Sequence, residues 1–279
     1  MIEVQQLWNG ITIPMIGFGT YKITEKGAAY EAVTKALMAG YRHIDTAAFY
    51  DNEGEVGRAI RDFVTSGQAV REDLFITSKV WKTENQYDLV MQSFDHTMQR
   101  LGLDYLDLYL VHWPSSPSFD EQWETTNQEV WRAMIDLYKS GRVKAIGVSN
   151  FLPHHLDTIM DMEVIPMVNQ IEINPGFMQQ DTIDYCKAHD IRIEAWSPLG
   201  RGRSLAHPLI QKLAATYGKS PAQIILRWEL QHDIIVLPKS VNEERIIENK
   251  AIWDFALTPE DMARMDALAP YGNSGHSPD

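Results

Sequence analysis

Short apolar runs recur along the chain, and amphipathic segments with helical spacing separate them. Runs of this kind are typical of strands that are buried on both faces of a parallel sheet. Eight of them can be identified, at residues 16–20, 42–47, 74–80, 105–113, 143–150, 168–173, 191–198 and 234–240. The amphipathic segments with helical period cover residues 28–40, 53–67, 87–102, 126–141, 152–160, 180–190 and 221–231.

Eight units of a strand followed by a helix or helical patch predict an α/β fold, the closed (β/α)8 TIM barrel. The alternative is a doubly wound open sheet, which usually has fewer units or a second domain. No Pro/Gly/Ser-rich linker interrupts the pattern, so residues 1–279 are expected to form a single domain. Two strand-like runs flank Asn9 and Gly10 and predict an N-terminal β-hairpin that closes the bottom of the barrel. The polar tail 270–279 is predicted to be irregular.

Composition narrows the possible partners and the compartment. The formal net charge is −13, which argues against nucleic acid and against an anionic membrane surface as partners. Cys186 is the single cysteine, so no disulfide can form within the chain. The sequence shows neither a signal-peptide pattern nor an apolar window long enough to span a membrane. A cytoplasmic protein is therefore expected.

Polar side chains stand at the ends of the predicted strands, where barrels of this type carry their active sites. Asp45 lies inside an apolar strand, and an unpaired buried carboxylate is costly. Tyr50 follows that strand, Lys79 ends the next one, and His112 ends the one after it. The later strands end in or pass Ser149–Asn150, Asn169–Gln170, Trp196–Ser197 and Lys239–Ser240. In a closed barrel these groups converge on one mouth.

The first four groups fit carbonyl reduction. Lys79 can pair with Asp45, and an ammonium beside the Tyr50 phenol is expected to lower its pKa from the usual value of about 10. Tyr50 would then be a general acid, and His112 would polarise the carbonyl oxygen. No flavin or metal signature occurs, so a nicotinamide is expected to supply the hydride. Taken singly, Asp45 and Lys79 are equally compatible with a structural ion pair, and a lone histidine at a strand end is more often a core residue.

Three segments resemble the signatures of the aldo-keto reductase family, and the resemblance covers nearly the whole chain. They are GYRHIDTAAFYDNEGEVG at 40–57, GRVKAIGVSNF at 141–151 and LPKSVNEERIIEN at 237–249. The stretch HWPSS and the ending YGNSGHSPD are most similar to the bacterial branch of 2,5-diketo-D-gluconate reductases and methylglyoxal reductases. The resemblance implies a catalytic tetrad of Asp45, Tyr50, Lys79 and His112.

The resemblance also implies that NADPH binds extended across the barrel mouth, without a Rossmann fold. The stretch GRGRS at 200–204 lacks the third glycine of a Rossmann fingerprint. The implied cofactor contacts are Thr20, Tyr21, Ser149, Asn150, Gln170, Trp196, Ser197, Leu199, Lys239, Ser240, Val241, Arg245, Glu248 and Asn249. Lys239 and Arg245 supply two cations and Ser240 supplies a hydroxyl, on a short loop that leads into a helix N-terminus. This arrangement independently favours an anion such as the 2′-phosphate of NADPH.

The substrate pocket implied by the resemblance is lined by Tyr21, Phe49, Trp81, His112 and Trp113. The segments 114–125 and after 270 are short, which predicts an open pocket that accepts small aldehydes and ketones. Relatives of this type are monomers, so a monomer is expected. One alternative is a non-catalytic NADPH-binding regulatory subunit, although it would have little need for the whole tetrad. The other is a metal-dependent barrel hydrolase, but only Asp45 and His112 offer ligands at strand ends, because His154–His155 opens a helix.

Overall fold

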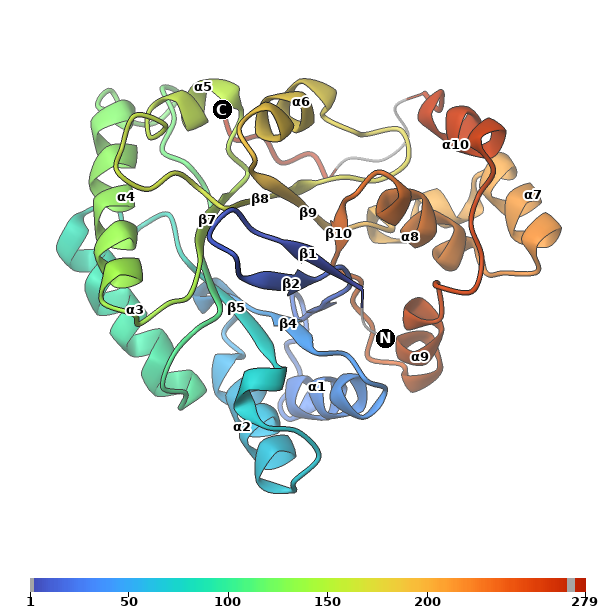
Figure 1. The fold of residues 1–279 in the computed structure, drawn as a ribbon, viewed down its shortest axis with the longest axis horizontal. Helices are drawn as coiled ribbons and strands as arrows, with labels where there is room; N and C mark the ends of the chain where they lie inside the picture. Colours follow the sequence, from blue (N-terminus) through green and yellow to red (C-terminus); the bar gives the residue numbers. More distant parts are fainter. Residues whose placement is uncertain (1–2, 270–273) are drawn as a thin grey trace.

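The computed structural model describes residues 3–269 and 274–279, and its central feature is a sheet of eight parallel strands (Figure 1). In sheet order these are β3 (Phe18–Gly19), β4 (His43–Asp45), β5 (Phe75–Val80), β6 (Leu108–Val111), β7 (Ile146–Ser149), β8 (Val168–Glu172), β9 (Arg192–Trp196) and β10 (Ile235–Val236). A parallel bridge between Ile16 and Val236 joins the last strand to the segment before the first. The predicted (β/α)8 barrel is therefore confirmed, and each strand lies within its predicted apolar run.

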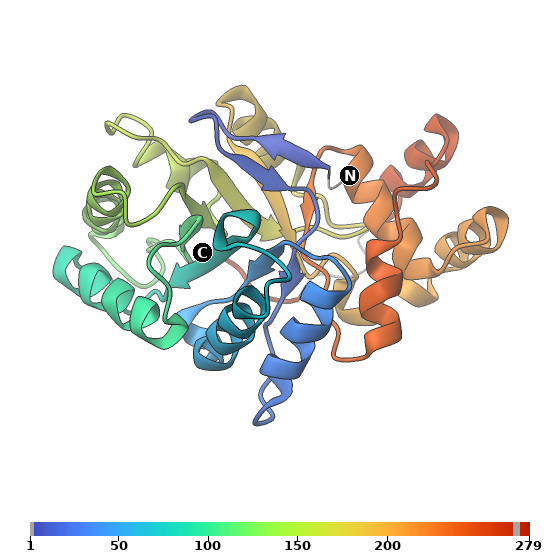
Figure 2. The same ribbon diagram turned by 60° about the horizontal axis from the view of Figure 1, so that its bottom comes forward.

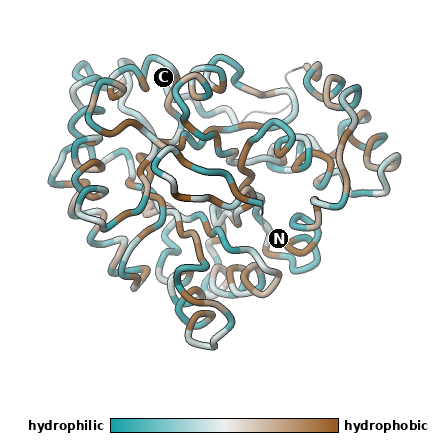
Figure 3. The backbone as a smooth tube through the Cα atoms, viewed as in Figure 1, coloured by the Kyte–Doolittle hydropathy of each residue, from teal (hydrophilic) through white to brown (hydrophobic). Residues whose placement is uncertain are grey.

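Helices surround the barrel (Figure 1), and the strands and helices share a core of buried apolar residues. Figure 3 shows how apolar and polar residues are distributed along the backbone. They are α1 (Ala28–Met38), α2 (Glu53–Thr65), α3 (Tyr87–Leu101), α4 (Trp123–Lys139), α5 (Pro153–Asp157), α6 (Gln180–Ala188), α7 (Pro208–Tyr217), α8 (Pro221–Gln231), α9 (Glu243–Lys250) and α10 (Pro259–Asp266). Short 3₁₀ helices also occur, including η1 (Ala48–Tyr50) directly after β4.

Three of these helices, α7, α9 and α10, lie outside the segments predicted from the hydrophobic pattern. In α10 only Met265 is buried, so the apolar stripe is too narrow to give a helical period. The helices α7 and α10 begin with a proline that follows a capping residue, His207 or Thr258. Proline fits the first helical position because its missing N–H has no partner there. The helix α5 is shorter than the predicted segment 152–160.

The N-terminal hairpin, β1 (Val4–Gln6) and β2 (Thr12–Pro14), covers the end of the barrel where the strands begin (Figures 1 and 2). Gly10 in its turn has φ +88°, a conformation that favours glycine. The hairpin bonds to chain segments just before or at the start of β7, β8, β9 and β10, through Asn9 to Lys144, Trp8 to Pro166, Gln6 to Arg192 and Gln5 to Asp233. The hairpin therefore closes the bottom of the barrel, as predicted.

The chain segment after α10 is only partly described. Residues 270–273, which belong to the predicted irregular tail, lie outside the described residues. Residues 274–279 form neither helix nor strand, and Ser274 donates hydrogen bonds through its N–H and its hydroxyl to the carboxylate of Glu172 at the end of β8. The tail therefore returns to the end of the barrel where the strands finish. None of the helices among the described residues combines the length and apolarity that a membrane crossing requires.

Candidate active site

Asp45 and Lys79 form an ion pair between neighbouring strands β4 and β5. Lys79 Nζ lies 2.7 Å from each carboxylate oxygen of Asp45 and also donates to the carbonyl oxygen of Thr46 at 3.0 Å. The lysine side chain is fully buried and that of Asp45 is 5% exposed. Burial alone would lower the pKa of Lys79, but Asp45 and Tyr50 outweigh it, so this pKa is raised. Lys79 is therefore charged at neutral pH, and Asp45 has its partner.

Tyr50 is the third member of the group. Its hydroxyl lies 3.2 Å from Lys79 Nζ, close enough for the ammonium to donate a hydrogen bond to it. Burial raises the pKa of Tyr50 to about 12, although Lys79 acts to lower it. The predicted net lowering was therefore wrong for the protein on its own, because desolvation of the phenolate outweighs the nearby ammonium. The phenol carries its proton at neutral pH and is oriented to give it up.

His112 completes the group from the residue after β6. Its ring centroid lies 5.6 Å from that of Tyr50 and 5.0 Å from that of Trp81. Burial, assisted by the positive charge of Lys79, holds the pKa of His112 well below its usual value. The imidazole is therefore neutral and can donate one N–H to a carbonyl oxygen. The four predicted residues, which come from three successive strands and the segment after the first of them, are brought together.

A cavity of about 710 Å³ opens above this group at the end of the barrel where the strands finish. Every predicted substrate residue lines it, and Phe49 stacks on Trp81 with ring centroids 3.8 Å apart. The predicted residues in its wall are Tyr21, Asp45, Phe49, Tyr50, Trp81, His112, Trp113, Ser149, Asn150, Gln170, Trp196, Ser197, Leu199 and Lys239. His276 and Ser277 also line it, so the short tail narrows a pocket that was predicted to be open.

One wall of the cavity is a set of polar side chains with fixed orientations. The Asn150 amide donates to the carbonyl oxygen of His112 at 2.9 Å and accepts from the Trp196 indole N–H at 2.8 Å. The Ser149 hydroxyl donates a hydrogen bond to the main-chain carbonyl oxygen of Gln170 at 2.7 Å. Thr20 is buried and donates to the carbonyl oxygen of Asp45, so it supports β4 instead of lining the cavity.

The residues predicted to bind the adenosine phosphate lie around the start of α9. Lys239 lines the cavity, and its pKa is lowered by partial burial. The Ser240 hydroxyl oxygen accepts a hydrogen bond from the N–H of Asn242. The side-chain oxygen of Asn242 in turn accepts the N–H of Arg245 and caps α9. Arg245, Glu248 and Asn249 follow on α9 with spacings of three and four residues, so they share one face. Ser240, Val241 and these three α9 residues do not line the cavity itself.

Sequence reasoning overlooked several residues of the site. Arg201 lines the cavity from the GRGRS stretch, which was considered only as a failed Rossmann motif. Glu194 and His43 lie buried beneath Asp45, 3.5 Å apart between Oε1 and Nε2. Each is a polar residue inside an apolar strand run, the same signal that identified Asp45.

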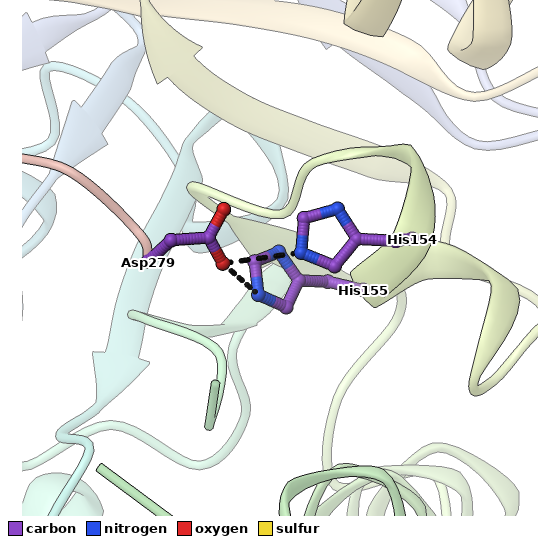
Figure 4. A group of neighbouring side chains, drawn as sticks. All are labelled: His154, His155 and Asp279. Carbon is purple, nitrogen blue, oxygen red and sulfur yellow. Dashed lines mark hydrogen bonds and ion pairs between the residues drawn. The ribbon is translucent and has the colours of Figure 1, made fainter. Parts of the chain in front are cut away.

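The tail is held over this end of the barrel by a second contact (Figure 4). Asp279 Oδ1 lies 3.1 Å from His154 Nε2 and 3.2 Å from His155 Nε2. These three residues could approach a metal ion, but His155 Nδ1 already accepts the N–H of Leu152. The proton of the neutral His155 ring is therefore on Nε2. We call this group, His154, His155 and Asp279, the tail clasp.

Comparison with known proteins agrees with this geometry. The profile of the aldo/keto reductase family matches residues 15–270. The uncharacterized oxidoreductase YtbE of Bacillus subtilis (strain 168) is 48% identical over 274 residues, covering 98% of this chain and 95% of the relative. The glyoxal reductase of the same organism is 46% identical over 278 residues, covering 99% and 96%. The crystal structure of MGS-M4, an aldo-keto reductase from a deep-sea metagenome library, has a TM-score of 0.91 at 39% identity and covers 99% of this chain and 98% of that chain. The chain belongs to the aldo/keto reductase family.

Proposed function

We propose that the protein is an NADPH-dependent reductase of small aldehydes and ketones, with Tyr50 as the proton donor. The observation that carries this proposal is the hydrogen bond between the Tyr50 hydroxyl and the buried Lys79 ammonium at 3.2 Å. An ammonium in this position stabilises the phenolate that forms when the proton leaves. A purely structural ion pair would not require a phenol on the same ammonium, facing a cavity.

The residues of the cavity fit a nicotinamide cofactor. A bound nicotinamide supplies the hydride in this chemistry. Ser149, Asn150 and Gln170 offer amide and hydroxyl groups to its carboxamide, and the half-buried Trp196 ring offers an aromatic face. The carbonyl oxygen of a substrate that lies beside Tyr50 would accept one hydrogen bond from the phenol and one from His112.

Preference for NADPH over NADH rests on charge at the start of α9. Lys239 and Arg245 are exposed cations on a protein with a formal net charge of −13, and no ion pair engages either of them among the described residues. Arg245 also lies in the first turn of α9, where unpaired backbone N–H groups favour an anion. Both positive charges are therefore available to pair with a bound 2′-phosphate.

The substrate class is taken from the cavity and from the relatives. The similarity to the glyoxal reductase of Bacillus subtilis supports the proposal that small dicarbonyl compounds such as methylglyoxal are substrates. The aromatic wall formed by Phe49 and Trp81 would also accept aromatic aldehydes, and keto-sugar acids such as 2,5-diketo-gluconate belong to the same class of expected substrates. The proposed enzyme is a monomer that acts in the cytoplasm.

The test is consumption of NADPH and of NADH with methylglyoxal, 2,5-diketo-gluconate, benzaldehyde and an aldose. We expect turnover with several carbonyls and a higher kcat/KM with NADPH. Tight NADPH binding without turnover of any substrate would contradict the reductase and favour a cofactor-binding regulatory subunit. Equal efficiency with the two cofactors would contradict the role of Lys239 and Arg245.

A further inference from the structure

A second carboxyl group lies beside the catalytic Asp45, inside the barrel. Glu194 comes from β9, is fully buried, and does not line the cavity. The amide nitrogen of Gln170 joins the two groups, because Nε2 lies 2.7 Å from Glu194 Oε2 and 3.0 Å from Asp45 Oδ2. An amide nitrogen has two N–H donors, and each carboxyl group takes one.

This arrangement fixes the orientation of the Gln170 amide. If the amide were reversed, its carbonyl oxygen would face the carboxylate of Asp45, which is unfavourable. Because Nε2 is directed inward, the side-chain oxygen of Gln170 is the atom of the amide that remains free to face the cavity, which this residue lines. Glu194 therefore acts at a distance from the cavity, through the side chain of Gln170.

The contacts of Glu194 are those of a neutral acid. Asp45 receives two bonds from Lys79, whereas Oε1 of Glu194 is buried and has no hydrogen-bond partner. Nε2 of His43, which also lies 3.1 Å from Thr77 Oγ1, is 3.5 Å from Oε1, and burial keeps this ring neutral by lowering its pKa to about 3. A proton on Oε1 directed at this nitrogen would give the buried Oε1 a partner.

The charged and titratable groups around Glu194 come from two strands. His43 and Asp45 face it from β4, and Lys79 acts on it from β5. Its register partner on β10 is Ile235, which brings no charge. Burial, and then the charge of Asp45, raise the pKa of Glu194 to about 8, so the neutral acid is the form at neutral pH.

We propose that Glu194 is a positioning residue for carbonyl reduction, which as a neutral acid holds Gln170 between Asp45 and the cofactor. This inference rests on the proposed function. Ionisation of Glu194 would place a second negative charge beside Asp45, pull Gln170 away from it, and make the Tyr50 phenol a weaker acid. Reduction is therefore expected to slow as the pH rises through about 8.

The test compares wild type with Glu194→Gln and Glu194→Leu. The amide of E194Q keeps an acceptor for Gln170 and a donor for His43 but cannot ionise, so its kcat/KM should lack the alkaline loss that wild type shows near pH 8. E194L removes the acceptor and should weaken cofactor binding about tenfold, because the Gln170 amide is released. Glu229→Gln is the matched control, since Glu229 is a fully buried acid on α8, away from the cavity.

An alkaline loss that persists in E194Q, or disappears equally in E229Q, would overturn the proposal. Failure of E194Q to fold would also contradict it, because the amide reproduces the donor and the acceptor of a neutral acid. Cofactor affinity is measured by quenching of tryptophan fluorescence and requires no turnover. Absence of turnover in wild type would therefore count against the proposed reductase, whereas an unchanged cofactor affinity in E194L would count against the positioning role alone.

Discussion

Replacement of Lys79 by Met separates the structural role of the buried ion pair from its chemical role. The substitution removes the ammonium that lies 2.7 Å from both oxygens of Asp45 and leaves that buried carboxylate with the Gln170 amide as its one side-chain donor among the described residues. Removal of one partner of a buried pair typically costs about 3–5 kcal/mol. Because a domain is stable by only about 5–15 kcal/mol, Lys79→Met should be folded but clearly destabilised.

The double variant Asp45→Asn with Lys79→Met is the informative comparison. It contains no unpaired charge, and the new amide oxygen can still accept the Gln170 N–H. We expect it to recover most of the free energy of unfolding that Lys79→Met loses. Neither variant should regain carbonyl reduction, because the phenolate of Tyr50 would have no ammonium beside it. A loss of activity of at least about a hundredfold is expected in both.

Urea unfolding followed by tryptophan fluorescence measures these differences, with the slope against urea compared between variants. Two results would refute the reasoning. A loss below about 1 kcal/mol in Lys79→Met would mean that the pair is not desolvated as its burial implies. A double variant with wild-type activity would mean that the ammonium serves the fold and not the chemistry.

Three further predictions follow from single contacts. Arg245→Ala should weaken NADPH binding at least about tenfold and leave NADH unchanged, because only NADPH has the 2′-phosphate; equal losses in fluorescence titrations would exclude that role. Asp279→Ala should open the tail clasp and raise the KM of small carbonyls with kcat retained, because His276 and Ser277 would leave the cavity wall, and unchanged kinetics would show that the tail does not contribute to substrate binding. Wild type should lose stability relative to Glu194→Gln as the pH rises from about 5 to about 8, since the folded state holds a proton that the unfolded state releases; parallel urea-unfolding curves at both pH values would contradict this.

The barrel could be predicted because its strands are short apolar runs that are buried on both faces, a pattern that depends on local sequence alone. The clustering of Asp45, Tyr50, Lys79 and His112 could be predicted for a related reason. Asp45 and Lys79 are charged residues inside or at the end of such runs, and the fold places strand ends together. Their contact over 34 positions required only the assignment of neighbouring strands.

The features that were missed depend on the balance of opposing effects or on contacts between distant segments. The pKa of Tyr50 could not be predicted, because burial and the Lys79 charge act in opposite directions and only the geometry decides between them. The tail clasp joins residues 125 positions apart, and no local pattern marks it. Glu194 gave the same sequence signal as Asp45, but it lies behind Gln170, so the strand-end rule did not bring it into the site.

The most direct test of the proposed reductase is reduction of methylglyoxal with NADPH by wild type and by Tyr50→Phe. The substitution removes one hydroxyl, the proposed proton donor, which lies 3.2 Å from Lys79 Nζ. We predict turnover in wild type, loss of turnover in Tyr50→Phe, and the same affinity for NADPH in both proteins. Turnover retained in Tyr50→Phe would show that the proton comes from another group and would contradict the mechanism.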